Sequence, residues 1–189
     1  ELGATTSVFP TDENTLAYLK QQGREDEYVE MKADDDATYD ETIEIDMSTL
    51  VPMVAQPHSP DNVVDVKELE GMKINQVVIG SCTNSSLPDM MRAAKILKGR
   101  KVAEDVSLVI APGSSSILSM LAQNGALADM IHAGARILEC GCGPCIGMGQ
   151  SPNSKGISLR TFNRNFEGRS GTKDGQIYLV SPETAAISA

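Results

Sequence analysis

The segment Ile74-Asn75-Gln76-Val77-Val78-Ile79-Gly80-Ser81 is typical of a strand buried on both faces, because it is a short apolar run rich in β-branched residues. Ser85 and Ser86 follow closely and are typical caps of a helix N-terminus. The next apolar positions keep the spacing of one helical face: Leu87, Met90, Met91, Ala94 and Leu97. A buried strand, a turn and an amphipathic helix in succession favour an α/β fold.

The same alternation continues to the end of the chain. Further strands are expected at residues 106–111, 135–138, 157–162 and 177–180. Helical segments are expected around Leu118, around Met130 and from Pro182 onward. Strands that alternate with helices at this spacing predict a three-layer α/β/α domain with a mainly parallel sheet.

The first 65 residues differ from this pattern. Residues 1–24 are expected to be the C-terminal end of a preceding α/β domain, with a helix that begins near Asp12 and stops at Gly23. Residues 25–65 are acidic and punctuated by prolines, which indicates a connection to the α/β domain at 66–189. The chain opens with Glu-Leu-Gly-Ala rather than Met, so we expect it to be a piece of a longer protein.

Composition narrows the class of protein. Hydrophobic residues at 41% and charged residues at 22% of 189 are ordinary for a globular chain, and no apolar run is long enough to span a membrane. The net charge of −10 predicts no general affinity for nucleic acid. Residues 1–70 hold 18 acidic and four basic residues, whereas residues 71–189 hold eight acidic and 12 basic ones, so an anionic ligand is expected in the second part.

The four cysteines are the clearest functional signal. Cys82 follows the first expected strand, and Cys140, Cys142 and Cys145 follow the third. Ligands of open α/β sheets bind outside the carboxyl ends of strands, so cysteines about 60 residues apart in sequence are expected to meet there. Crowded cysteines without a secretory signal favour a metal or redox site in a reducing compartment.

Four interpretations of these cysteines remain open. Idle thiols would explain one isolated cysteine but explain Cys-x-Cys-x-x-Cys poorly. A zinc site would need all four side chains, and Cys140 and Cys142 are too close in sequence to grip one tetrahedral ion well. A thioredoxin-like dithiol is favoured by Cys-Gly-Pro-Cys, but the chain has no Trp and Cys82 would have no role. An iron–sulfur cluster held by Cys82, Cys142 and Cys145, without Cys140, would leave one iron open for substrate.

A second candidate site lies in the motif Asn163-Arg164-Asn165-Phe166-Glu167-Gly168-Arg169. Its two arginines flank the end of an expected strand within the basic part of the chain. Guanidinium groups bind carboxylates through two parallel hydrogen bonds, so paired arginines favour a polycarboxylate ligand. Two surface arginines without a ligand are the alternative.

Three motifs together resemble the signatures of the aconitase family, in the family's order and at about its spacing. They are Gly80-Ser81-Cys82-Thr83-Asn84-Ser85, Cys142-Gly143-Pro144-Cys145-Ile146-Gly147 and the motif from Asn163 to Arg169. The opening Gly3-Ala4-Thr5-Thr6-Ser7-Val8-Phe9-Pro10 also resembles aconitase sequence, at the end of the preceding domain. The resemblance covers essentially the whole chain.

The resemblance implies a [4Fe-4S] hydro-lyase of the tricarboxylic acid cycle that interconverts citrate and isocitrate through cis-aconitate. The family's cluster ligands match Cys82, Cys142 and Cys145. Its substrate-pocket residues match Asn163, Arg164 and Arg169, and an active-site carboxylate matches Glu1. Cys140 matches no ligand.

Two related enzymes, 3-isopropylmalate dehydratase and homoaconitase, share the cluster and the Asn-Arg-Asn-Phe motif and remain the alternative. Cys-Gly-Pro-Cys and the opening segment favour aconitate hydratase. The implied partners are a tricarboxylate and the remaining enzyme domains, one of which carries the serine base, so this piece alone is expected to be inactive. The implied location is the cytoplasm, or the mitochondrial matrix in a eukaryote. RNA binding, which occurs in some aconitase relatives, gains no support from the net charge of −10.

Overall fold

The computed structural model describes residues 4–189, and the chain divides into two compact units, Glu1–Leu50 and Val51–Ala189. Among its described residues, the first unit contains one α-helix, α1 (Glu13–Gln21), and two short 3-10 helices, η1 (Glu25–Glu27) and η2 (Met47–Thr49). Asp12 caps α1 by accepting a hydrogen bond from the backbone N–H of Thr15 at 2.9 Å. The helix predicted between Asp12 and Gly23 is therefore present. None of residues 4–50 is buried, so this unit has no core of its own.

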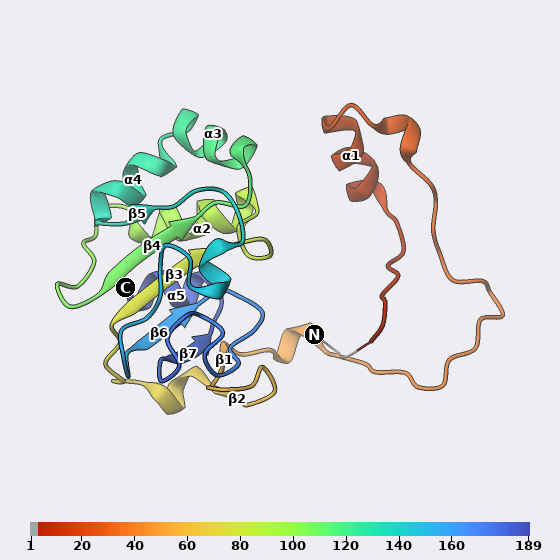
Figure 1. The fold of residues 1–189 in the computed structure, drawn as a ribbon. Coiled ribbons are helices and arrows are strands. Elements are labelled where there is room, and N and C mark those ends of the chain that lie inside the picture. The colour runs from red at the N-terminus through yellow and green to blue at the C-terminus, as the bar shows by residue number, and fades with distance from the viewer. Residues whose placement is uncertain (1–3) are drawn as a thin grey trace. The chain divides into compact units, whose positions relative to one another are not determined.

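The second unit is built on one seven-stranded sheet (Figure 1). Across the sheet, the strands lie in the order β2 (Val63–Asp65), β1 (Met53–Ala55), β7 (Gln176–Leu179), β6 (Ile157–Arg160), β3 (Gln76–Gly80), β4 (Ser107–Ala111) and β5 (Arg136–Ile137). The five strands from β7 to β5 are mutually parallel, whereas β1 pairs antiparallel with both β7 and β2. The predicted α/β class and mainly parallel sheet are confirmed.

The β1–β2 hairpin was not expected, because its strands are only three residues long and lie in a segment interrupted by Pro52, Pro57 and Pro60. The hairpin nevertheless belongs to the sheet, since Ala55 pairs with Leu179 of β7. The boundary between the two compact units falls after Leu50 in the sequence, so residues 51–65, which the sequence assigned to a connection, belong to the same unit as the sheet.

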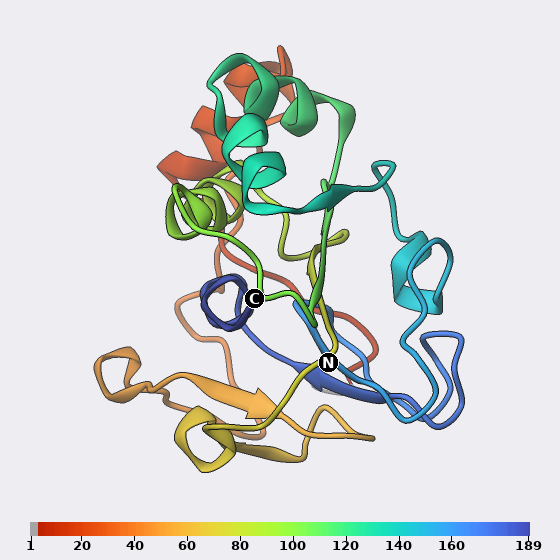
Figure 2. The same cartoon turned by 90° about the vertical axis from the view of Figure 1, so that its left-hand side faces the viewer.

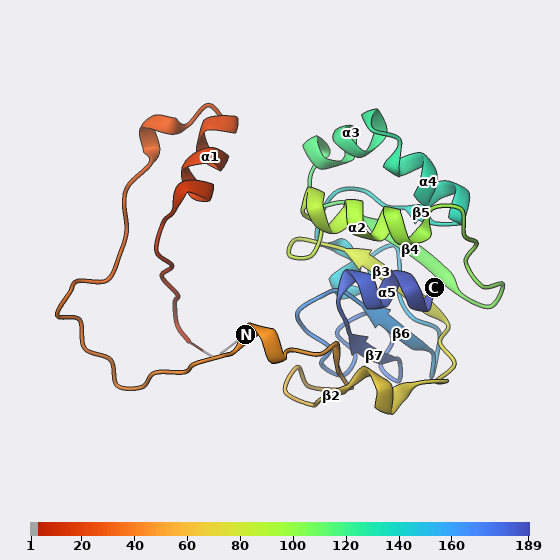
Figure 3. The same ribbon diagram turned by 180° about the vertical axis from the view of Figure 1, so that it is seen from behind.

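Four α-helices pack on one face of this sheet: α2 (Leu87–Leu97), α3 (Ser115–Gln123), α4 (Ala126–Ala133) and α5 (Pro182–Ser188). Figure 3 shows α2 and α5 lying across the strands. Their buried side chains share one core cluster with Val77, Ile79, Ile110 and Leu159 of the strands. Among the described residues, no helix is both long and apolar enough to cross a membrane.

The opposite face of the sheet is covered differently from the expected second helical layer. There Val78, Val109 and Phe162 form a smaller core cluster with Cys145. The 3-10 helix η4 (Gly143–Ile146) supplies that cysteine, and in Figure 2 this cyan segment lies on the side of the sheet opposite to α2 (yellow-green) and α5 (dark blue). The loop that carries Cys145 therefore covers this face of the sheet in place of the expected second layer of helices.

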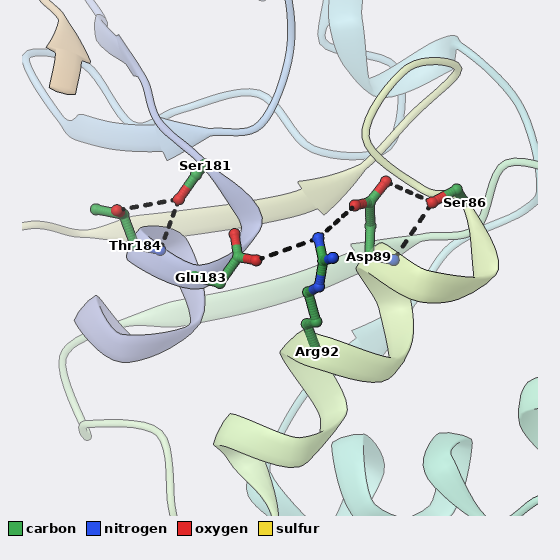
Figure 4. A network of polar contacts seen from close by, with 6 residues as sticks. All are labelled: Ser86, Asp89, Arg92, Ser181, Glu183 and Thr184. Carbon is green, nitrogen blue, oxygen red and sulfur yellow. Dashed lines mark hydrogen bonds and ion pairs between the residues drawn. The ribbon is translucent and has the colours of Figure 1, made fainter. Parts of the chain in front are cut away.

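The first turns of α2 and α5 are joined by a network of polar contacts (Figure 4). Ser86 caps α2 by accepting from the N–H of Asp89 at 3.3 Å, and Ser181 caps α5 by accepting from the N–H of Thr184 at 3.1 Å. Arg92 lies between Asp89 and Glu183, 3.8 and 3.6 Å away. The predicted capping role of Ser86 is thus confirmed.

The strand order places a topological switch point beside β3. From β3 the chain moves outward to β4 and β5 on one side, then returns to β6 and β7 on the other side. In open parallel sheets, such a reversal leaves a crevice outside the carboxyl ends of the two central strands. Here those strands are β3 and β6, which lead directly into the Cys82 segment and the Asn163 segment.

Candidate functional site

A sharp backbone turn carries the chain out of β3 and into Cys82. Gly80 has φ +123°, and a Cβ there would overlap the carbonyl oxygen of Ala111. Ser81 has φ 76°, which is strained for a residue with a side chain, yet it is buried and its N–H donates to the Ala111 carbonyl at 2.9 Å. The next residue, Cys82, is exposed. The strain therefore serves to present this thiol at the edge of the sheet.

The second cysteine segment folds back onto the sheet. Cys140 is half-buried, Cys142 is exposed, and Cys145 within η4 is buried. Gly147 ends η4 with φ +85°, and a Cβ there would overlap the carbonyl oxygen of Ser170. The tight approach at Gly147 joins this segment to the loop that carries Arg169.

Cys142 is near enough to both Cys82 and Cys145 for the two neighbouring thiols to affect its ionisation. The hydrogen bond of its thiol with Cys145, its partial burial and the charge of Cys145 raise the pKa of Cys142 to about 11, and Cys82 adds to this effect. The pKa of Cys82 is lowered, chiefly by its contact with the Thr83 hydroxyl at a separation of 3.6 Å and also by its hydrogen bond with Cys142. Cys82 is therefore the more easily ionised of this pair.

The chemistry of this donor set fits an iron–sulfur cluster. Thiolates are the usual ligands of such clusters, and in a four-iron cube each ligand sulfur binds a different iron. Within residues 4–189, no three His, Cys, Asp or Glu side chains are already arranged around a single-ion site. A cluster does not need that arrangement, because its ligand sulfurs surround a cube instead of converging on one atom. Each thiol must lose its proton when it binds a metal. This loss is least favourable for Cys142, because its pKa is raised to about 11.

The end of β6 is bound directly to the Cys82 segment. The backbone N–H of Gly80 donates to the Thr161 hydroxyl at 2.8 Å, and the Asn84 side-chain amide donates to the Thr161 carbonyl at 2.6 Å. Asn163 donates from Nδ2 to Thr83 Oγ1 at 2.7 Å. The structure thus brings Asn163 beside Cys82, although 80 residues separate Asn163 from Thr83.

The two expected substrate arginines flank this junction. Arg164 is exposed and makes further interactions, and Arg169 is half-buried. The Arg169 loop packs against the cysteine segment, since Ser170 Oγ donates to the Cys145 carbonyl at 3.4 Å. Both arginines therefore lie in segments that contact a cysteine loop. Glu1, the expected active-site carboxylate, lies outside the described residues.

One residue that contacts the site was missed by the sequence analysis. Arg160 is fully buried at the end of β6, and its guanidinium reaches the cysteine segment. The alternation of Ile157, Leu159 and Thr161 with Ser158, Arg160 and Phe162 was the available signal, because it places Arg160 on the same face of β6 as Phe162. The analysis weighed only the arginines after the strand.

The fold is that of an α/β domain, and a cysteine-bearing segment and the Asn163 segment follow the two strands at its switch point. The chain belongs to the aconitase family (aconitate hydratase), whose family model matches residues 1–189. The resemblance drawn from the three motifs is thereby confirmed.

Curated relatives are similar over the whole chain. It is 46% identical to "3-isopropylmalate dehydratase large subunit 2" of Archaeoglobus fulgidus over 190 residues, which are 100% of this chain and 46% of that protein. It is 45% identical to "Methanogen homoaconitase large subunit" of Methanocaldococcus jannaschii, with coverage of 100% and 47%. A third relative, "3-isopropylmalate dehydratase large subunit 1" of Thermotoga maritima, is 44% identical, with coverage of 100% and 46%. The chain spans about half the length of these relatives.

These names favour a different member of the family from the one the sequence analysis preferred. Cys-Gly-Pro-Cys and the opening segment pointed to aconitate hydratase, but the relatives are large subunits of 3-isopropylmalate dehydratase and homoaconitase. The two features were weak evidence because neither was tied to a contact with substrate. The alternative interpretation therefore has better support than the first.

Proposed function

We propose that this chain is the cluster-bearing part of a hydro-lyase of the 3-isopropylmalate dehydratase or homoaconitase type. The observation that carries the proposal is the packing of the Asn163–Arg169 motif against both cysteine segments, through the bonds from Asn163 to Thr83 at 2.7 Å and from Ser170 to the Cys145 carbonyl at 3.4 Å. The names of the relatives support the choice of substrate class.

Cys82, Cys142 and Cys145 would hold a [4Fe-4S] cluster, whose fourth iron would act as a Lewis acid on a substrate oxygen. Arg164 and Arg169 would bind substrate carboxylates, and their planar guanidinium groups suit that geometry. Asn163 would orient a polar group of the substrate, because its bond to Thr83 holds its side chain beside the cysteines. Glu1 would contact the departing hydroxyl group. The segments that carry Cys82 and Cys145 are packed against those that carry the arginines, which favours binding and activation in one place.

The partners would be a small organic acid and a second chain or domain. The relatives are named large subunits, which supports a small subunit as the partner that completes the active site. We expect this chain alone to be inactive, since the general base belongs to that partner.

The ligand set is tested by serine substitution in the full-length protein with its partner. After anaerobic reconstitution with iron and sulfide, we expect Cys82→Ser, Cys142→Ser and Cys145→Ser to lose most cluster iron. Cys140→Ser is the matched control, because it lies in the same segment and should keep its iron. Loss of iron in Cys140→Ser but not in Cys82→Ser would contradict the ligand assignment. A reversible Cys142–Cys145 disulfide without iron would favour a dithiol redox protein instead.

The substrate class is tested by turnover. We expect kcat/KM of the reconstituted enzyme to be higher for 3-isopropylmalate or for the homoaconitase substrate than for citrate and isocitrate. A preference for citrate would return the assignment to aconitate hydratase. Equal iron content in all assays is the required control, since cluster loss would lower every rate together.

A further inference from the structure

We propose that Arg160 is a positioning residue that holds the Cys142–Cys145 segment against the sheet and offsets its negative charge. Arg160 would touch neither cluster nor substrate and would act through the loop that carries two of the three ligands. The electrostatic part of this proposal rests on the proposed function, whereas the positioning part does not.

The burial of Arg160 is the first observation. Its side chain is 0% exposed, and it is the largest of the fully buried side chains in the described chain. A buried charge is costly unless hydrogen bonds satisfy it, so an arginine at such a place needs a compensating set of acceptors. None of the ion pairs among the described residues involves Arg160, so carboxylates do not supply that compensation.

The acceptors come instead from the backbone of the cysteine loop. Arg160 Nη1 donates to the Pro144 carbonyl at 2.6 Å, and Nη2 donates to the Gln150 carbonyl at 2.7 Å. Pro144 directly precedes Cys145, so the first of these bonds fixes the backbone beside a proposed ligand. The two bonds together hold both ends of the segment from 144 to 150.

Two buried polar neighbours complete this arrangement. Arg160 Nη2 also donates to Gln76 Oε1 at 2.9 Å, and its Nε donates to Ser158 Oγ at 3.1 Å. Gln76 in turn donates from Nε2 to the Ser151 carbonyl at 3.0 Å. We call Arg160, Gln76 and Ser158 the arginine anchor. Through this anchor, side chains of β3 and β6 donate hydrogen bonds to three backbone carbonyls of the cysteine loop, those of Pro144, Gln150 and Ser151.

Charge is the second function of the anchor. Burial lowers the pKa of Arg160 to about 10, which still leaves the guanidinium protonated at neutral pH, and the charge of Cys145 opposes the shift. A four-iron cluster with three thiolate ligands has a net negative charge that grows on reduction, so a fixed positive charge close to it stabilises the reduced state. Removal of the charge should therefore lower the reduction potential, while a lysine at this place should largely preserve it.

The positioning role is tested without any cluster, by amide hydrogen exchange of the metal-free full-length protein. We expect Arg160→Met and Arg160→Lys to speed exchange in residues 142–151 at least tenfold, because neither side chain can donate to both ends of the loop. Exchange in β4 should stay unchanged. Arg136→Met is the matched control: the exposed Arg136 donates to the Gly149 carbonyl and the Gln150 side chain of the same loop, and we expect less than a twofold effect.

Unchanged loop exchange in the Arg160 variants would overturn the positioning role, and so would an equal effect of Arg136→Met. If Arg160→Met does not fold, Arg160→Lys alone decides this part. The electrostatic role is tested by the cluster midpoint potential after reconstitution, which should fall in Arg160→Met and stay near the parent value in Arg160→Lys. Equal potentials in all three proteins would overturn it. Failure of the parent protein to take up a cluster would overturn the proposed function, while the exchange result would still decide the positioning role.

Discussion

At the scale of single residues, the cysteine edge depends on places where no larger side chain fits. Gly80 and Gly147 both have positive φ angles, and at both a Cβ would overlap a carbonyl oxygen of another segment. These close approaches bring β4 against the Cys82 turn and the Arg169 loop against η4. The site is therefore assembled by backbone proximity as much as by side-chain contacts.

Gly147→Ala should be clearly more destabilising than Gly99→Ala. Gly99 also has positive φ, +72°, but nothing lies within 4 Å of its Cβ position, so the change there should cost only about 1–2 kcal/mol of backbone strain. At Gly147 the overlap with Ser170 adds about 1–3 kcal/mol. Thermal or denaturant unfolding measures the loss of stability in both variants. Equal losses would show that the backbone at Ser170 moves aside without an energetic penalty.

Arg169→Ala should lower kcat/KM of the full-length enzyme without loss of cluster iron. The loss of a guanidinium–carboxylate contact that leaves a buried charge unpaired costs about 2–5 kcal/mol. Arg169→Lys should recover part of this loss, because lysine keeps the charge but lacks the planar pair of donors. Arg100→Lys, at an exposed position, is the control. Normal activity of Arg169→Ala would make Arg169 an ordinary surface residue.

At the scale of elements, periodicity predicted the five parallel strands and the helices that follow them, because buried strands and amphipathic helices carry strong local patterns. It failed for β1 and β2, whose three-residue strands are held by pairing with β7 and not by their own sequence. The cysteines were singled out by their crowding and by their place after strands, and Asn163 by the resemblance to the aconitase family. Arg160 was missed because local pattern does not reveal which buried polar group will find acceptors in a distant loop.

The polar network between α2 and α5 should owe its stability to the caps and little to the ion pairs. Ser86→Ala removes the cap of α2 and should lower the free energy of unfolding by about 1 kcal/mol. Arg92→Ala should cost about 0.5 kcal/mol or less, because the Arg92 side chain is 63% exposed and its partners are 3.6–3.8 Å away. Chemical denaturation of the two variants measures the difference, and a larger cost for Arg92→Ala would reverse this ranking.

At the scale of the whole molecule, the sheet unit contains everything needed for its own core. All seven strands and both core clusters lie in residues 51–189. The switch point between β3 and β6 gathers segments from positions 80–84 and 161–163 at one edge.

Residues 51–189 should therefore fold without residues 1–50. We expect the shortened chain to unfold in a single cooperative transition with a midpoint close to that of the 189-residue chain, because none of residues 4–50 is buried. Circular dichroism during heating makes this measurement. A shortened chain without a cooperative transition would show that the first fifty residues contribute to the core.

The pairing of β3 with β6 also sets the order of events during synthesis. Val78 of β3 pairs with Arg160 of β6. Some eighty further residues must therefore be synthesised after β3 before β6 can pair with it. Until then Cys82 has been made, but the loop with Cys142 and Cys145 lacks the arginine that holds its backbone. Such long-range pairing is slow compared with helix formation. We therefore expect the proposed cluster to be inserted late, after β6 has paired with β3.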